Sequence, residues 1–85
     1  TGQQPGLFGG PLYVLSKALS ALALADALEA AIGMPVAPVF WAATDDADFA
    51  EASAVRVAHG PHVDTLRAAP TAPDGTPLAA VPLGD

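Results

Sequence analysis

A long helix that is apolar on two of its faces constrains the fold of this chain more than any other feature. Pro11 suits a first helical position, where its missing N–H costs nothing, and Gly33 suits the left-handed position just past a helix end. We therefore predict a helix over residues 11–32. Its apolar side chains form two stripes on different sides, one of Leu12, Leu15, Leu19 and Leu22 and one of Leu24, Leu28 and Ile32.

The chain is too short to bury both apolar faces of such a helix. Its 85 residues would make one small domain, 52% of them are hydrophobic, 14% are charged, and no cysteine can staple a small core. A domain of this size cannot bury that much apolar surface. We therefore expect residues 1–85 to be an internal fragment of one domain of a larger protein.

The charge balance excludes two classes of partner. Lys17, Arg56 and Arg67 are the only fixed cations in a chain of net charge -6, whereas a nucleic-acid groove needs clustered lysine and arginine. The helix is not a membrane span, because Lys17, Asp26 and Glu29 would each cost about 2.5 to 3.5 kcal/mol near the bilayer centre. The absence of cysteine fits a reducing cytosol, and we expect a cytoplasmic protein.

The order of elements predicts an α/β fold. Residues 36–43, VAPVFWAA, are typical of a strand buried on both faces of a parallel sheet, although Pro38 indicates an edge position or a bulge. A loop, a helix and a strand in this order imply a parallel partner strand that ends just before Thr1.

The second half of the chain consists of short expected elements joined by turns. An acidic turn precedes a further short strand at residues 54–58, AVRVA, so residues 1–58 comprise loop, helix, strand, acidic turn and strand. Residues 59–85 are rich in proline and glycine, and we predict a hairpin there, with its turn at Asp74 and Gly75.

The loop before the helix is the first candidate binding site. Glycine lets the backbone take positive φ and lets a ligand approach closely, and the loop has four of them: Gly2, Gly6, Gly9 and Gly10. The free N–H groups of the following helix favour a phosphate or carboxylate, while Gln3 and Gln4 suit a sugar, an amide or a nucleotide edge. The alternative is a tight strand-to-helix turn without a ligand, since no phosphate-loop or dinucleotide pattern is present.

The acidic turn is the second candidate. Four carboxylates follow the strand, at the position where ligands bind in open α/β sheets: Asp45, Asp46, Asp48 and Glu51. They could hold an ammonium group, orient a hydroxyl, act as a general base or share Mg²⁺. The alternative is a solvated loop in which Asp48 or Asp46 caps a short helix.

Other side chains near these segments have two interpretations each. Lys17, about two turns into the helix, could reach a phosphate, but a lysine there more often turns to water or pairs with a carboxylate. Trp41 could stack on a ring or pack in the core. His59 and His62 have the separation of some metal pairs, but no third ligand has a suitable spacing, so we predict no metal site.

Three blocks carry a resemblance to one enzyme family, in this order: TGQQPGLFGGPLY with its helix, GMPVAPVFWAATDDADFAEASAV, and DGTPLAAVPLGD. Together they resemble the bacillithiol biosynthesis cysteine-adding enzymes, the BshC family. The resemblance implies part of a Rossmann-like, nucleotidyltransferase-like core, without the rest of the sheet and without the family's coiled-coil insert. The acidic turn of the family usually contains a histidine where this chain has Ala47, so no role of that histidine carries over.

The resemblance also implies a reaction, the ligation of cysteine to glucosaminyl malate in the last step of bacillithiol biosynthesis. Forming the amide requires an activated carboxylate, for which ATP and Mg²⁺ are the expected co-reactants. Full-length members are expected to be homodimers. The alternatives are a module that binds a nucleotide or a sugar acid without catalysis, and an inactive truncated fragment.

On this basis the loop is expected to bind the activated carboxylate or phosphate, and the acidic turn the ammonium of cysteine or the amine of the sugar. The expected binding residues are Gly2, Gln3, Gln4, Gly6, Gly9, Gly10, Lys17, Trp41 and Asp45, with Asp46 and Asp48 as the catalytic pair.

Overall fold

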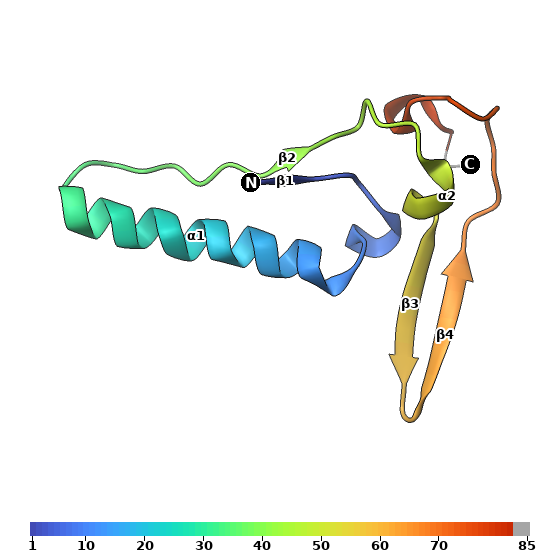
Figure 1. Cartoon of the computed structure of the whole chain (residues 1–85), viewed down its shortest axis with the longest axis horizontal. Coiled ribbons are helices and arrows are strands. Elements are labelled where there is room, and N and C mark those ends of the chain that lie inside the picture. The colour runs from blue at the N-terminus through green and yellow to red at the C-terminus, as the bar shows by residue number, and fades with distance from the viewer. Residues whose placement is uncertain (83–85) are drawn as a thin grey trace.

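The computed structural model describes residues 1–82 and shows one long helix lying beside irregular chain, with a hairpin projecting from one end (Figure 1). Leu83, Gly84 and Asp85, which end the third block of the sequence, lie outside the described residues. The elements are β1 (Gly2–Gln3), the 3₁₀ turn η1 (Leu7–Gly9), α1 (Leu12–Ile32), β2 (Trp41–Ala42), α2 (Phe49–Ala52), β3 (Ala54–His59), β4 (His62–Arg67) and the 3₁₀ turn η2 (Leu78–Ala80).

Helix α1 confirms the predicted helix to within one residue. Pro11 is its N-cap, with extended backbone (φ -62°, ψ 154°), rather than its first helical residue. Gly33 ends the helix in the left-handed conformation (φ 67°), and its N–H donates to the carbonyl of Glu29 at 2.9 Å. The two residues that set the prediction therefore act where expected, because proline needs no N–H partner and glycine tolerates positive φ.

Strands β1 and β2 form a parallel pair, with Gly2 opposite Trp41. Backbone hydrogen bonds continue the ladder, since Trp41 N–H donates to the Thr1 carbonyl at 2.8 Å and Ala43 N–H to the Gln3 carbonyl at 3.0 Å. The βαβ order is confirmed, but the prediction that the first strand ends before Thr1 is wrong. Gly2 and Gln3 have no apolar strand pattern, yet the backbone N–H and C=O groups that form a ladder do not depend on the side chain.

The prediction of a strand over residues 36–43 that is buried on both faces is wrong in extent and in burial. Strand β2 has only two residues, and both are exposed. Two prolines in residues 34–40 cannot donate to a ladder, and these residues run back along α1 instead (Figure 1). Glu29 fastens them to the helix, because its Oε2 accepts a hydrogen bond from Val36 N–H at 3.0 Å.

Strands β3 and β4 form an antiparallel hairpin in which Ala54 lies opposite Arg67 and His59 opposite His62. The expected strand at residues 54–58 is confirmed, but its partner was not predicted. The predicted hairpin around Gly75 is wrong, since only a turn lies there and no strand flanks it within residues 1–82. The real turn contains Gly60 at φ 57°, because a two-residue hairpin loop favours glycine where φ is positive.

Little of the described chain is buried. Ala25 and Ser53 are the only buried residues among residues 1–82, while Leu12 is 81% exposed. The chain exposes 6339 Å², whereas a compact protein of its mass would expose about 4,600 Å². Its radius of gyration is 16.4 Å, against about 12 Å for a compact domain of this length.

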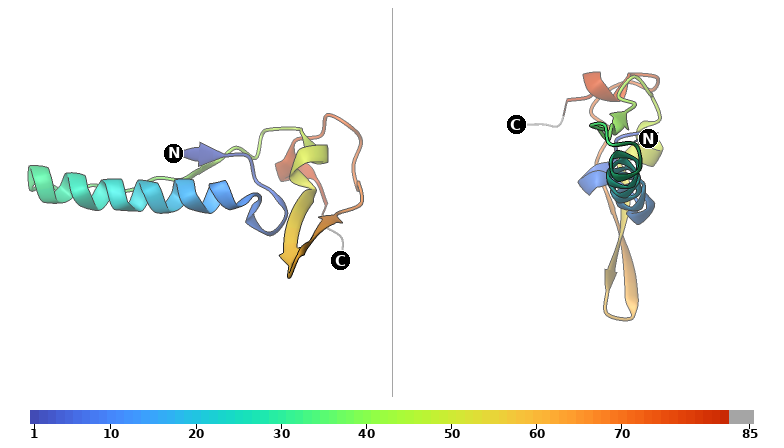
Figure 2. Two further views of the ribbon diagram at one scale, coloured as in Figure 1. Left: turned by 60° about the horizontal axis from the view of Figure 1, so that its bottom comes forward. Right: turned by 90° about the vertical axis from the view of Figure 1, so that its left-hand side faces the viewer.

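In both views of Figure 2 the tip of the hairpin projects away from the helix. The excess of exposed apolar surface predicted from the helix stripes is therefore confirmed for the isolated chain. No helix among residues 1–82 is long and apolar enough to cross a membrane.

Candidate functional site

The loop and the acidic turn meet where β1 and β2 end. Residues 4–11 leave the carboxyl end of β1, and residues 43–48 leave the carboxyl end of β2, its parallel neighbour. A direct hydrogen bond joins the two segments, from Gln4 Nε2 to the carbonyl oxygen of Asp48 at 2.9 Å. The expected place of the acidic turn, outside the carboxyl end of a strand, is confirmed, and the chain brings both candidate segments together there.

Backbone geometry divides the four loop glycines into two pairs. Gly9 and Gly10 have positive φ, 88° and 79°, as expected of glycine. Gly6 has φ -148°, and a Cβ there would lie 2.9 Å from the Cα of Gly10. A Cβ on Gly2 would lie 3.0 Å from the carbonyl oxygen of Trp41. Gly9 and Gly10 thus use the conformational freedom of glycine, whereas the missing side chains of Gly2 and Gly6 make room for the chain's own backbone.

Phe8 shares the unusual conformation of this loop. It has φ 52° and ψ 32°, and it is the only residue other than glycine with positive φ among residues 1–82. A left-handed conformation costs a side-chain-bearing residue about 1 to 2 kcal/mol. Its ring is nevertheless 80% exposed, so burial of this side chain within the described residues does not compensate for the strain.

Lys17 fastens β1 to α1. Its ammonium donates to the carbonyl oxygen of Gly2 at 2.6 Å and to Gln3 Oε1 at 2.9 Å. Gln3 is held on its other side, because its Nε2 donates to Tyr13 Oη at 3.1 Å. Both of these bonds go to a carbonyl or amide oxygen of β1, whereas the sequence suggested water or a carboxylate as the partner of Lys17. A ligand role for Lys17 stays a prediction, and it would have to use the third proton of the ammonium.

The carboxylates of the acidic turn organise its backbone. Asp46 Oδ1 accepts a hydrogen bond from Asp48 N–H at 3.0 Å, and Asp48 Oδ1 accepts one from Glu51 N–H at 3.0 Å. Asp48 is thus the N-cap of α2, as in the capping interpretation of the sequence. Asp45, Asp46 and Asp48 are all exposed. Capping uses one oxygen of a carboxylate, so the second oxygen of Asp46 and of Asp48 is available to a ligand.

The backbone of the turn is held from the other side by η2. Leu78 N–H donates to the Asp46 carbonyl at 2.8 Å, and Ala79 N–H donates to the Thr44 carbonyl at 2.9 Å. Ala47 is half-buried in this turn. Within residues 1–82, no three histidine or acidic side chains converge as a metal-binding cluster. Carboxylate oxygens are the donors that Mg²⁺ prefers, but the turn could supply only one or two of them.

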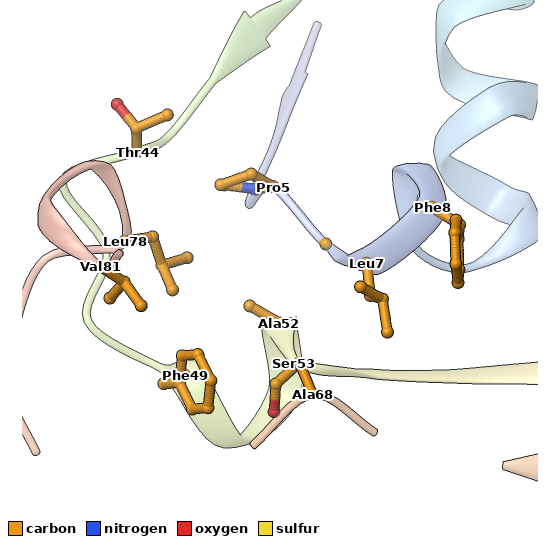
Figure 3. A pocket seen from close by; sticks show the side chains of 11 residues that line it. Pro5, Leu7, Phe8, Thr44, Phe49, Ala52, Ser53, Ala68, Leu78 and Val81 are labelled. Carbon is orange, nitrogen blue, oxygen red and sulfur yellow. The ribbon is translucent and has the colours of Figure 1, made fainter. Parts of the chain in front are cut away.

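An apolar pocket of about 360 Å³ lies beside the loop and the turn (Figure 3). In Figure 3 the side chains of Phe49, Leu78 and Val81 gather on one side of the pocket, and Leu7 lies on the other. The complete lining is Pro5, Gly6, Leu7, Phe8, Thr44, Phe49, Ala52, Ser53, Ala68, Leu78 and Val81. The volume is in the range of small-molecule sites, and the mostly apolar lining suits an uncharged part of a ligand.

The sequence interpretation missed this pocket and the hydrogen bond between Gln4 and Asp48. The apolar pair Leu7 and Phe8, inside a glycine-rich loop, was a signal for the pocket, because loop residues of that kind need a reason to be apolar. Trp41 was expected at the site, and β2 places it next to Gly2 with 69% of its surface exposed. Stacking by Trp41 on a ligand stays a prediction.

Comparison with known proteins gives one consistent result. Residues 1–80 match the family model described as bacillithiol biosynthesis BshC, N-terminal Rossmann-like domain. Curated relatives carry the name "Putative cysteine ligase BshC": one from Heliobacterium modesticaldum is 53% identical over 60 residues, which are 71% of this chain and 11% of the relative. One from Desulforamulus reducens is 42% identical over 72 residues, 82% of this chain and 13% of the relative. The chain thus spans about a tenth of the length of these relatives.

Proposed function

Because this chain belongs to the BshC family of bacillithiol biosynthesis, through the Rossmann-like domain at the N-terminus of that family, we propose that it carries the first part of the active site of a cysteine ligase. The observation that carries the proposal is the contact between Gln4 and Asp48, which joins the loop and the acidic turn at the carboxyl ends of two parallel strands. Ligands bind at this edge of open α/β sheets. Names of relatives support the ligase class, since they are called cysteine ligases.

The proposed reaction joins the carboxyl group of cysteine to the amine of glucosaminyl malate, as the last step of bacillithiol biosynthesis. The carboxylate is first activated, with ATP as the proposed source of the activating group. The amine, as the free base, then attacks the carbonyl carbon and gives up one proton, an amide bond forms, and the activating group leaves with one carboxylate oxygen. The site must therefore hold an ammonium or amine close to a negatively charged, activated carboxyl group.

The two segments suit these two tasks. Three exposed aspartates in the turn produce a negative potential that favours an ammonium group, and Asp46 and Asp48 each keep one carboxylate oxygen available. Residues 6–10 of the loop lead directly into α1, whose N-terminus favours an anion. Asp46 and Asp48 are the proposed catalytic pair, and the apolar pocket beside them would take an uncharged part of a substrate.

Substitution of the turn carboxylates tests this proposal in the complete gene product. Asp48→Asn and Asp46→Asn keep a side-chain oxygen that can accept the bonds of Glu51 N–H and Asp48 N–H, so the turn should keep its fold. Removing a charge that binds an ammonium should lower product formation by about 100-fold. Product is measured by mass spectrometry after mixing with cysteine, glucosaminyl malate, ATP and Mg²⁺.

The matched control is Asp64→Asn, since Asp64 is an exposed aspartate on the projecting hairpin. We expect this variant to keep the activity of the natural protein. Unchanged turnover in both turn variants would remove Asp46 and Asp48 from the active site.

A binding module without catalysis is the second candidate, and Ala47 in place of the family's histidine favours it. The two candidates differ in one measurement. Titration with ATP and with glucosaminyl malate separately would show affinity in both cases, but only the ligase forms the amide. Affinity without product, in a protein that is folded, would favour the binding module.

A further inference from the structure

The only two arginines of the chain lie on one face of the hairpin. In the register of β3 and β4, Arg56 pairs with Thr65, and Ala54 pairs with Arg67. Side chains two residues apart along a strand share a face, so Arg56, Thr65 and Arg67 point to the same side. The two guanidinium groups are therefore diagonal neighbours, within reach of one another for side chains of this length.

This face borders a hollow of about 500 Å³ at the base of the hairpin. Its other walls come from α2 and from the start of α1, which Figure 1 shows beginning beside the hairpin. The complete lining is Pro11, Ala50, Glu51, Ala54, Val55, Arg56, Thr65 and Arg67. The hollow lies apart from the apolar pocket, with which it shares no lining residue.

The hollow is lined by more positive than negative side chains, although the chain as a whole is acidic. The net charge is -6 and only three lysines and arginines are present. Lys17 already donates to the Gly2 carbonyl and to Gln3, whereas within residues 1–82 neither arginine takes part in a side-chain hydrogen bond. Glu51 also lines the hollow, so two guanidinium groups and one carboxylate leave one net positive charge.

We propose that this hollow binds the phosphate or carboxylate group of a small molecule, held by the guanidinium groups of Arg56 and Arg67 with the Thr65 hydroxyl between them. Guanidinium groups bind such oxyanions through two parallel N–H bonds, which suits two arginines on one face. Two guanidinium groups at diagonal positions of neighbouring strands repel one another, and a bound anion offsets that repulsion.

The test is binding of two probe anions, pyrophosphate and succinate, to the complete gene product by isothermal titration calorimetry at low salt. At least one probe should bind the natural protein, and the preferred probe identifies the ligand as a phosphate or a carboxylate compound. Arg56→Gln and Arg67→Gln should each weaken this binding about 10-fold, since each removes a charge-assisted hydrogen bond. Arg67→Lys keeps the charge without the paired N–H geometry, and should lie between the natural protein and Arg67→Gln.

The control is Asp64→Asn, because Asp64 pairs with Val57 on the opposite face of the hairpin and changes the charge without facing the hollow. It should leave probe binding within about twofold, since it removes no contact to the anion. Circular dichroism and thermal melting establish that each variant is folded. Absence of binding for both probes, or equal binding by the natural protein and the folded Arg56→Gln and Arg67→Gln variants, would overturn the proposal. Probe binding and thermal melting can both be measured without ligase activity.

Discussion

Replacing Gln4 by glutamate tests whether one hydrogen bond holds the loop to the acidic turn. The change is nearly isosteric, but it replaces the Nε2 donor, which lies 2.9 Å from the Asp48 carbonyl, with a negatively charged oxygen. The lost hydrogen bond accounts for about 1 kcal/mol, and repulsion by the exposed aspartates of the turn adds about 0.5 to 1 kcal/mol in a water-like dielectric. The local opening free energy should fall by about 1.5 to 2 kcal/mol, which is a 10- to 30-fold change in the opening equilibrium.

The neighbouring substitution, Gln3→Glu, is the matched control, with the same chemical change and the opposite expected sign. Gln3 Oε1 accepts a hydrogen bond from Lys17 at 2.9 Å, so a carboxylate there gains an ion pair. Tyr13 Oη, which now accepts from Gln3, can rotate its proton and donate to the carboxylate instead. We expect Gln3→Glu to leave local stability unchanged or to raise it by up to about 1 kcal/mol.

Hydrogen exchange of the complete gene product, followed by mass spectrometry, measures both effects in peptides covering residues 1–10 and 43–53. Gln4→Glu should speed exchange 10- to 30-fold in both peptides, because the local opening free energy falls by about 1.5 to 2 kcal/mol. Gln3→Glu should slow exchange or leave it unchanged. If Gln4→Glu changes exchange less than about threefold, or if Gln3→Glu speeds it equally, the hydrogen bond does not hold the site together.

Two further predictions concern the loop and its attachment to α1. Gly6→Ala places a Cβ 2.9 Å from the Gly10 backbone and should lower the unfolding free energy by about 1 to 3 kcal/mol through overpacking. Gly9→Ala meets no atom within 4 Å and should cost only about 1 kcal/mol, for its positive φ; equal losses of stability in urea unfolding would contradict the packing role of Gly6. Lys17→Met removes two hydrogen bonds to β1 and should lower stability by about 1.5 to 3 kcal/mol. An increase in urea stability on that substitution would show that the ammonium has no structural role.

The helix and its ends were predictable from sequence because their determinants are local. Pro11 and Gly33 act through their own backbone preferences, and neither depends on a distant partner. The cap by Asp48 belongs to the same class, since its acceptor and the Glu51 donor lie three residues apart. Such local backbone preferences and caps can be predicted from a single sequence.

The errors concern features that depend on partners far along the chain. The extent of β1 is set by backbone pairing with residues about 40 positions later, and its two residues, Gly2 and Gln3, carry no strand pattern. The β3–β4 hairpin was missed because all of residues 59–85 was assigned to one segment rich in proline and glycine, although proline is tolerated in the turn beside Gly60. The predicted turn at Gly75 does form, but flanking residues rich in proline cannot make a ladder.

Only part of the site was accessible to the same reasoning. Residues of the loop and the acidic turn were named correctly as neighbours of strand ends, since that follows from the topology of α/β folds. The packing of Gly2 against Trp41 depends on the register of β1 with β2, and so does the choice of which of the two glutamine side chains reaches the turn. The apolar pocket depends on η2 folding back onto the turn, a contact between residues more than 30 positions apart.

The most direct test of the central claim, that the loop and the acidic turn form one ligand site, is a hydrogen-exchange footprint of the natural, complete gene product. Exchange is compared without ligands and with cysteine, glucosaminyl malate, ATP and Mg²⁺ present. The structure predicts that residues 4–11 and 43–49 become protected together, because Gln4 and Asp48 couple the two segments. Binding that protects other parts of the protein and leaves both segments unchanged would contradict the claim.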